Sequence, residues 1–426
     1  MTMPVYPRIA VLVDLPGGTT AGGHVKYWEL MAQAVVKEKA PIDLTVYFLG
    51  DRADDVLSPQ VRLRYLPPFF STAHLKFLPY VPAHTDLAPL HPRLAKELPS
   101  YDLLHATDAY FAFARTAERV SRQHGIPLVT SFHTDTPAYA ELFTHEMLLS
   151  LFGKRAGARI DSLLKISKRE RAKKNKRLGQ HLQACSAVFA MRPADKVLAQ
   201  KYIPEGLVRR MRMGVDKDLF VPLQDARAEI ERDYNIPPGK FLTLFVGRVD
   251  AGKNMPLLVQ ACAKTIENGV KLHLIVAGLG PMSAEVKAVL GDNATLAGFL
   301  SPEKLAKLYA AVDCLSMVSD IEIGGLIGAE ALSCGCPVLA SALNGMPVLY
   351  GNSPAIQEVE SNVSSWTDAL TRMSENKEQR TAMHDAAVIF RREKLGGWPD
   401  LLKEDFLPVW EALVRKDKTK CSANAS

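Results

Sequence analysis

The apolar positions of this chain alternate between two patterns along almost its whole length. Short runs rich in branched aliphatic residues predict strands, and the segments between them, such as 256–266 and 302–311, repeat apolar residues with helical spacing. Alternating strands and helices favour parallel sheets with helices on both faces. The runs that predict strands are 8–14, 42–49, 61–66, 102–106, 127–132, 186–190, 241–247, 271–277, 294–297, 313–317 and 337–341.

The two series of strands predict an α/β protein of two Rossmann-like, doubly wound domains that face each other across a cleft, because one core does not usually serve 426 residues. We expect an N-terminal domain over 1–205 and a C-terminal domain over 206–397. Paired glycines followed by Trp398-Pro399 end a helix, so we expect a new helix over 398–416 to pack back on the first domain. The polar tail, 417–426, is expected to be disordered.

Composition narrows the class of protein. Hydrophobic residues make up 47% and charged residues 23% of the chain, as in ordinary globular proteins, and no apolar run is long enough to cross a membrane. The first residues lack the pattern of a secretory signal, so we expect a cytoplasmic protein. Cys334 and Cys336 are the only close pair of cysteines and lack a zinc-binding spacing, so we interpret them as buried structural thiols and expect no metal site.

Ligands of open parallel sheets bind at the carboxyl ends of strands, and two loops of the first half have suitable residues there. The loop 14–24 contains four glycines, including Gly22 and Gly23, which allow a ligand to approach the backbone; alone it equally fits a flexible connection. The segment 130–139 places His133 after a strand, where a functional role and a structural one are equally consistent with the sequence.

In the second half, the loop 247–254 combines Arg248 and Lys253 with a turn and a helix start. A diphosphate requires fixed positive charge and backbone N–H groups of this kind, although surface cations are common. The spacing is not that of a Walker motif, and no segment has the glycine fingerprint of an NAD-binding oxidoreductase.

The segment 321–335 is the most informative. Glu322 precedes Gly324 and Gly325, whose flexibility suits a helix start that meets a phosphate, and Glu330 follows eight residues later inside an almost wholly apolar helix. No basic residue stands three or four positions from Glu330 on this helix. A buried carboxylate needs a hydrogen-bond donor, and the hydroxyls of a ribose are suitable donors.

In this order, these motifs resemble glycosyltransferase family 4, over roughly residues 8–345. The resemblance implies the GT-B fold, retention of configuration at the anomeric carbon, and a UDP- or GDP-hexose donor used without cofactor or metal. The matching motifs are Gly22-Gly23, Ser131-Phe-His133-Thr134, Arg212-Met-Gly214-Val-Asp216 with Phe220, Gly247-Arg248 with Lys253, Ala277-Gly278-Leu-Gly280 and Glu322-x7-Glu330.

The resemblance also implies a role for each candidate residue. Arg248 and Lys253 would hold the donor diphosphate, and Glu330 the ribose. The remaining contacts would come from Glu322 and His133 to the hexose, Gly22 and Gly23 to the donor phosphates, Gly324 and Gly325 to the donor, and Phe299 to the nucleobase.

Two departures from the family pattern concern the donor pocket. The family usually has an aromatic residue at the position of Gly324, and its common Pro-Glu segment after Gly345 is replaced here by Met346-Pro-Val-Leu-Tyr. We therefore expect an altered pocket for the donor sugar. A nucleotide-sugar-binding protein without activity, or another GT-B enzyme such as a sugar-nucleotide epimerase, are the alternatives.

A basic run over 154–177 bears on the acceptor. It holds eleven Lys or Arg residues against two acids, which fits a solvated helical face, an anionic membrane or an acidic acceptor; no module typical of nucleic-acid binding accompanies it. His133-Thr-x-x-Pro137-x-Tyr139 is similar to a segment of family members that glycosylate membrane lipids. We therefore expect a lipid or lipid-linked acceptor and a protein at the inner face of a membrane, with contacts from Lys168, Arg169, Arg171, Lys173 and Lys174.

Overall fold

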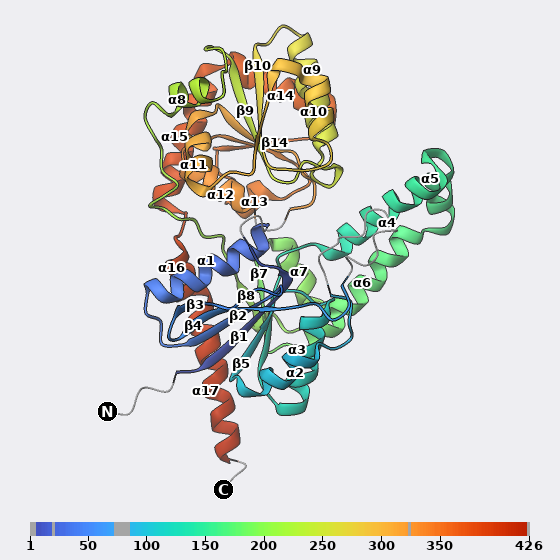
Figure 1. Ribbon diagram of the computed structural model, residues 1–426, viewed down its shortest axis with the longest axis vertical. Helices are drawn as coiled ribbons and strands as arrows, with labels where there is room; N and C mark the ends of the chain where they lie inside the picture. The colour runs from blue at the N-terminus through green and yellow to red at the C-terminus, as the bar shows by residue number, and fades with distance from the viewer. Residues whose placement is uncertain (1–5, 19–21, 72–85, 323–324, 424–426) are drawn as a thin grey trace. The chain divides into compact units, whose positions relative to one another are not determined.

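The computed structural model describes residues 6–18, 22–71, 86–322 and 325–423, with side chains described as far as residue 416. The chain divides into two compact units, Met1–Arg212 with Trp398–Ser426, and Met213–Gly397. Each unit is an α/β structure built on one sheet (Figure 1).

The sheet of the first unit is parallel except at one edge, where a short strand turns back on its neighbour. The buried strands consist almost entirely of apolar residues, as expected when helices cover both faces. In spatial order the strands are β3 (Asp55–Ser58), β4 (Val61–Leu66), β2 (Asp43–Leu49), β1 (Arg8–Pro16), β5 (Leu103–Ala106), β6 (Leu128–Ser131), β7 (Ala187–Ala190) and β8 (Val208–Arg210).

The end of the chain returns to the first unit. Trp410 is fully buried, and its indole N–H donates to His105 of β5 over 3.3 Å. The helix expected over 398–416 is divided by a π-helical segment, Leu402–Phe406, and continues to Ala423. The backbone of residues 417–423 is helical, whereas we expected a disordered tail from residue 417. These residues contain no proline or glycine that would end the helix. The covering helices are α1 (Gly23–Lys37), α2 (Pro92–Glu97), α3 (Ala112–His124), α7 (Pro193–Gln200), α16 (Trp398–Leu401) and α17 (Leu407–Ala423).

Three further helices, α4 (Thr136–Phe152), α5 (Lys154–Leu164) and α6 (Ile166–Gln183), form an arm that extends from the sheet of the first unit (Figure 1). The bend between α5 and α6 is fixed by Asp161, whose carboxylate accepts hydrogen bonds from Ser167 and lies 2.8 Å from His145 of α4. A Cβ at Gly157 would lie 2.4 Å from the Leu148 carbonyl oxygen, so only glycine lets α5 pack this closely on α4.

The second unit contains a fully parallel sheet with its strands in the order β11 (Ala294–Gly298), β10 (Leu272–Ala277), β9 (Phe241–Val246), β12 (Cys314–Met317), β13 (Val338–Ser341) and β14 (Ile356–Val359). Every strand predicted from an apolar run overlaps an observed strand. The short strands β3, β8 and β14 were not predicted. The helices of this unit are α8 (Ala226–Asp233), α9 (Met255–Glu267), α10 (Ser283–Leu290), α11 (Pro302–Ala311), α12 (Leu326–Ser333), α13 (Met346–Leu349), α14 (Val363–Glu375) and α15 (Lys377–Glu393).

Candidate functional site

The strand order of the second unit reverses between β9 and β12. From β9 the chain adds β10 and β11 on one side and then β12, β13 and β14 on the other. In open α/β sheets, such a reversal leaves a crevice at the carboxyl ends of the two central strands, and ligands bind there. Lys253 follows β9 and Glu322 follows β12, and their Nζ and Oε2 atoms are 2.8 Å apart. The tertiary structure thus brings two of the predicted site residues together at this point.

The loop after β9 is shaped by its own side chains. The Asp250 carboxylate accepts a hydrogen bond from the Lys253 backbone N–H over 2.9 Å, and Asn254, in the left-handed conformation, begins α9. Arg248 lies 3.3 Å from Asp250, and its side chain is 58% exposed. The loop therefore holds Lys253 in its ion pair while most of the Arg248 guanidinium is accessible to a ligand.

Two glycines after β10 allow that loop to rest on the loop after β9. A Cβ at Gly278 would lie 1.8 Å from the Gly247 carbonyl oxygen, and one at Gly280 would lie 2.3 Å from that of Val249. These distances exclude any side chain at either position. Both glycines of this predicted motif are thus required because the two loops meet backbone to backbone. This contact holds the loop after β9, which contains Arg248, in place.

The loop after β12 is braced by polar side chains that the sequence analysis did not identify. Asn344 donates to the carbonyl oxygens of Met317 and Ser319 over 3.3 and 3.2 Å. Asp320 accepts hydrogen bonds from Ser341, the last residue of β13, and from Ser361, which follows β14. These hydrogen bonds connect the carboxyl end of β12 to those of β13 and β14, and so the position of Glu322 depends on residues that are distant in sequence.

Glu330 is buried in α12, as its apolar neighbours predicted. Its carboxyl accepts a hydrogen bond from the Tyr309 hydroxyl of α11 over 3.1 Å, and burial raises its pKa to about 8. The carboxyl is therefore mostly protonated at neutral pH until a ligand supplies further donors. Tyr309 was missed, although a buried glutamate with no basic partner on its own helix is the signal that a donor must come from another element.

The start of α12 explains the unusual segment after Gly345. Gly325 adopts a left-handed backbone with φ of 58°, and a Cβ there would lie 2.3 Å from the Met346 sulfur. The Tyr350 hydroxyl donates to the Gly325 carbonyl oxygen over 3.2 Å. Residues that depart from the family pattern therefore support the helix start. Gly324 lies outside the described residues. Phe299, which directly follows β11, is half exposed.

The predicted residues of the first unit cluster around His133, which follows β6. Gly22 and Gly23 are exposed at the start of α1, and the next residue, His24, stacks on the His133 ring with 4.4 Å between centroids. Burial and the neighbouring imidazoles lower the pKa of His133 well below its ordinary value. The ring is therefore neutral at physiological pH.

The basic run lies on α5 and α6 of the arm, and part of its charge is already paired. Arg171 forms an ion pair with Glu141 at 2.8 Å. Lys173 and Lys174 form ion pairs with Glu170 at 3.8 and 3.9 Å. Lys168 and Arg169 are exposed. The turns at the two ends of α5 also expose apolar side chains that the sequence analysis did not identify, namely Leu151, Phe152, Leu163 and Leu164.

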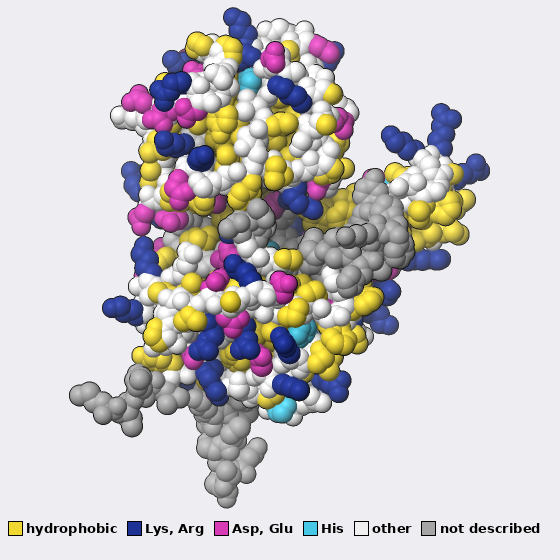
Figure 2. Space-filling view, in the orientation of Figure 1, with side chains coloured by type: hydrophobic (Ala, Val, Ile, Leu, Met, Phe, Trp, Pro, Cys, Tyr) yellow, Lys and Arg dark blue, Asp and Glu magenta, His cyan; other side chains and the backbone are white. Residues whose placement is uncertain are grey.

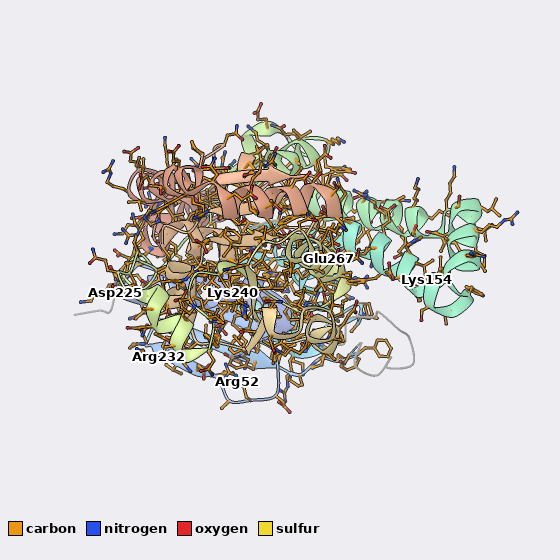
Figure 3. All side chains as sticks on the ribbon, turned by 90° about the horizontal axis from the view of Figure 1, so that it is seen from above. Arg52, Lys154, Asp225, Arg232, Lys240 and Glu267 are labelled. Carbon is orange, nitrogen blue, oxygen red and sulfur yellow. The ribbon has the colours of Figure 1, made fainter. Side chains whose placement is uncertain are left out.

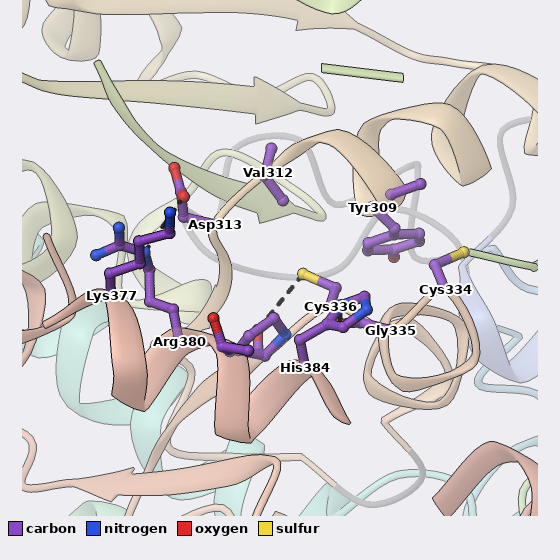
Figure 4. Close-up of a pocket in the computed structure, with 12 residues that line it drawn as sticks. Tyr309, Val312, Asp313, Cys334, Gly335, Cys336, Lys377, Arg380 and His384 are labelled. Carbon is purple, nitrogen blue, oxygen red and sulfur yellow. Dashed lines mark hydrogen bonds and ion pairs between the residues drawn. The ribbon is translucent and has the colours of Figure 1, made fainter. Parts of the chain in front are cut away.

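A separate cavity of about 280 Å³ lies at the amino ends of β12 and β13, the edge of the sheet opposite the predicted site (Figure 4). Polar side chains that line this cavity already interact with other groups of the protein. His384 Nδ1 lies 2.8 Å from the Gly335 carbonyl oxygen, and Arg380 lies 3.6 Å from Asp313. Cys334 and Cys336 line this cavity as buried free thiols. Within the described residues, no group of three or more His, Cys, Asp or Glu side chains is placed to hold a metal ion.

Comparison with known proteins agrees with this geometry. Residues 226–388 match the family described as Glycosyl transferases group 1. A D-inositol 3-phosphate glycosyltransferase of Actinosynnema mirum is 26% identical over 410 residues, which cover 89% of this chain and 92% of that protein. A sulfoquinovosyl transferase of Arabidopsis thaliana is 26% identical over 306 residues, covering 70% of this chain and 53% of that protein.

Solved structures show the same fold at low identity. Sucrose-phosphate synthase from Thermosynechococcus elongatus superposes with a TM-score of 0.65 and 18% identity, covering 99% of this chain and all of that chain. Anabaena HepE in complex with UDP and glucose has a TM-score of 0.64 and 14% identity, covering 98% of this chain and all of that chain. In the part of the chain that the structure describes, no helix is both long and apolar enough to cross a membrane.

Proposed function

We propose that this chain, which has the GT-B fold and a region similar to Glycosyl transferases group 1, is a glycosyltransferase that moves a hexose with retention from a UDP- or GDP-hexose to a hydroxyl group of a glycan or lipid-linked acceptor. The observation that carries the proposal is the Lys253–Glu322 pair at the strand-order reversal. One residue of the pair has the charge to hold a diphosphate, and the other can accept hydrogen bonds from a sugar.

The donor extends from this pair in both directions. Its ribose hydroxyls donate to Glu330, and its diphosphate meets Arg248, Lys253 and the backbone N–H groups at the start of α12. Glu322 and His133 contact the hexose, and Gly22 and Gly23 contact the donor phosphates. Phe299 lies beside the nucleobase. The solved structures of Anabaena HepE with UDP and glucose and with UDP-glucose support a nucleotide-sugar donor.

A front-face reaction fits these groups. The acceptor oxygen attacks the anomeric carbon on the side from which the diphosphate leaves, and a phosphate oxygen takes up the acceptor proton as the old bond breaks. Arg248 and Lys253 stabilise the charge that develops on the diphosphate, while the hydrogen bonds to the hexose hold the anomeric carbon in position beside the acceptor oxygen. Positive side chains and a helix start take the place of a divalent cation in this scheme.

The arm of the first unit supports an anionic membrane surface as the site of the acceptor. Apolar side chains at both ends of α5, with Leu163 as much as 72% exposed, lie close in sequence to Lys154, Lys165, Lys168 and Arg169. Lys154 is at the far part of the arm in Figure 3, and Figure 2 shows apolar and basic side chains together there. Apolar residues beside basic ones suit the boundary between acyl chains and acidic headgroups.

The test is a panel of UDP-, GDP- and ADP-hexoses added to the full-length chain. A true donor raises the unfolding temperature because it binds the native state alone. The stabilising donor is then incubated with glycan and lipid acceptors, and the anomeric configuration of the product is read by NMR. An inverted product, or stabilisation by no sugar nucleotide, would contradict the proposal.

A further inference from the structure

A row of hydrogen bonds leads from the core of the first unit to His133. Trp410 Nε1 is 3.3 Å from His105 Nδ1, and His105 Nε2 is 2.9 Å from Ser131 Oγ. The same oxygen is 2.9 Å from His133 Nε2, which is also 3.1 Å from Trp28 Nε1. The row connects α17, β5, β6 and α1, which are all parts of the same unit.

The chemistry of tryptophan fixes the direction of these bonds. An indole N–H can only donate, so His105 Nδ1 and His133 Nε2 must both be acceptors without a proton. Burial lowers the pKa of His105 to about 3, and therefore its single proton is on Nε2 and points to Ser131. The Ser131 hydroxyl accepts that bond and donates its own proton to His133 Nε2.

His133 has neighbours that oppose a second proton. The rings that face it are His24, stacked at an interplanar angle of 6°, and the edges of Tyr27 and Trp28. None of them is an anion, and a positive charge on His133 would place its Nε2 proton against the Trp28 N–H. The neutral ring therefore carries its proton on Nδ1, and no hydrogen bond to Nδ1 is formed within the described part of the chain.

We infer that Trp28 and Ser131 hold His133 as the Nδ1–H tautomer, so that this ring donates a hydrogen bond to an oxygen of the hexose or acceptor and does not act as a base. Trp28 and Ser131 are thus positioning residues, and His105 and Trp410 orient Ser131. The inference rests on the proposed function for the identity of the oxygen. It agrees with a reaction in which the departing phosphate, and not a side chain, takes up the acceptor proton.

The tautomer can be observed directly in the full-length chain with ¹⁵N-labelled histidine. Long-range ¹H–¹⁵N correlation separates protonated from unprotonated ring nitrogens, and His133→Asn assigns the signals. At pH 7 the wild type should show a protonated Nδ1 and an unprotonated Nε2 at His133. Trp28→Phe keeps most of the ring but removes the N–H, and should shift the tautomer equilibrium. An imidazolium or an Nε2–H tautomer in the wild type would overturn the inference, as would an unchanged tautomer in Trp28→Phe.

A matched control is Trp366→Phe in the second unit. Trp366 is as fully buried as Trp28, but its indole N–H has no partner among the described residues, so this change should leave the His133 signals unaltered. A shift of these signals in Trp366→Phe as large as that in Trp28→Phe would show a general response to lost packing and would also overturn the inference.

Measurement of kcat in two variants of His133 tests whether its ring acts as a hydrogen-bond donor. The side-chain amide of His133→Asn can still donate near the position of Nδ1 but cannot act as a base, whereas His133→Phe can do neither. We expect kcat to fall about a hundredfold or more in His133→Phe, with most of the loss recovered in His133→Asn. Equal losses in the two variants would contradict a donor role. If the wild type turns over no sugar nucleotide, the proposed function fails, while the NMR measurement still decides the tautomer.

Discussion

Lys253 Nζ lies 2.8 Å from Glu322 Oε2, and this contact joins the loops that follow β9 and β12. Both side chains are mostly buried, with 23% and 19% of their surfaces exposed. The family resemblance gives them different tasks, one at the diphosphate and one at the hexose. Because they touch, a change in either residue alters the charge that the other presents to the donor.

We predict that Glu322→Gln lowers turnover but strengthens binding of the nucleoside diphosphate about two- to fivefold. The amide is nearly isosteric but no longer neutralises Lys253, and a partly exposed ion pair contributes ~0.5–1 kcal/mol. Calorimetric titration with the nucleoside diphosphate measures this change. Weaker binding of the nucleotide in this variant would show that Glu322 does not compete with the phosphates for Lys253.

Arg248→Ala and Lys253→Ala should each reduce kcat/KM by the equivalent of about 2–4 kcal/mol, the usual scale for a lost group that stabilises developing charge. The fold should survive, since Arg248 is largely exposed and Lys253 lies in a loop. Arg232→Ala, which removes an exposed cation from α8, is the matched control. Near-native kcat/KM in both site variants would place the diphosphate elsewhere.

Binding of the nucleotide should release a proton from Glu330. In the ligand-free protein its carboxyl has a pKa of about 8, raised from 4.5 by burial, so it is mostly protonated at pH 7. Ribose hydroxyls donate to the ionised form and lower that pKa. Affinity should therefore rise between pH 7 and about 8 and then level off. Calorimetry in buffers of different ionisation enthalpy measures the proton, and Glu330→Gln should remove the part of the release that belongs to this group.

Tyr309→Phe offers an independent check on the same carboxyl. The Tyr309 hydroxyl donates to Glu330 and holds its pKa down, so its removal should raise that pKa further. The rise in affinity should then move to higher pH than in the wild type. A pH profile of nucleotide affinity that is unmoved by Tyr309→Phe would contradict the assignment.

The raised pKa of Glu330 also has a consequence for stability. The folded state binds more protons at Glu330 than the unfolded chain between about pH 4.5 and 8, and so the free energy of unfolding should fall as pH rises through this window.

The arm should bring the protein to vesicles of anionic lipid. Replacement of Leu163 and Leu164 by serine should weaken this binding by at least about tenfold, because each leucine transferred out of water contributes ~1 kcal/mol or more. Binding should also weaken with salt, which screens Lys168 and Arg169. The control Val56→Ser changes an equally exposed residue of β3. Equal binding to neutral and anionic vesicles would leave the arm without a membrane role.

Transfer should continue in the presence of EDTA, because Arg248, Lys253 and the helix start stabilise the charge of the diphosphate in the proposed site. The measurement is the initial rate with and without chelator, after prior dialysis against EDTA. Loss of activity that magnesium or manganese restores would contradict a metal-independent reaction.

The sequence by itself determined the two sheets and where to look for the site. Apolar runs predicted the buried strands because parallel strands covered on both faces contain little else. The strands β3, β8 and β14 were missed because they lie at sheet edges and mix polar with apolar residues, so none of them contains a continuous apolar run. The buried state of Glu330 also followed from local sequence, since the other residues of its helix are almost all apolar.

The tertiary structure alone decided which of these residues meet. Lys253 and Glu322 are 69 positions apart, and only the strand order places them together. The donor of Glu330, the methionine beneath Gly325 and the tryptophans around His133 and His105 all come from other elements. Such contacts depend on how surfaces pack, and a hydrophobic pattern fixes which face of an element is buried without specifying its partner.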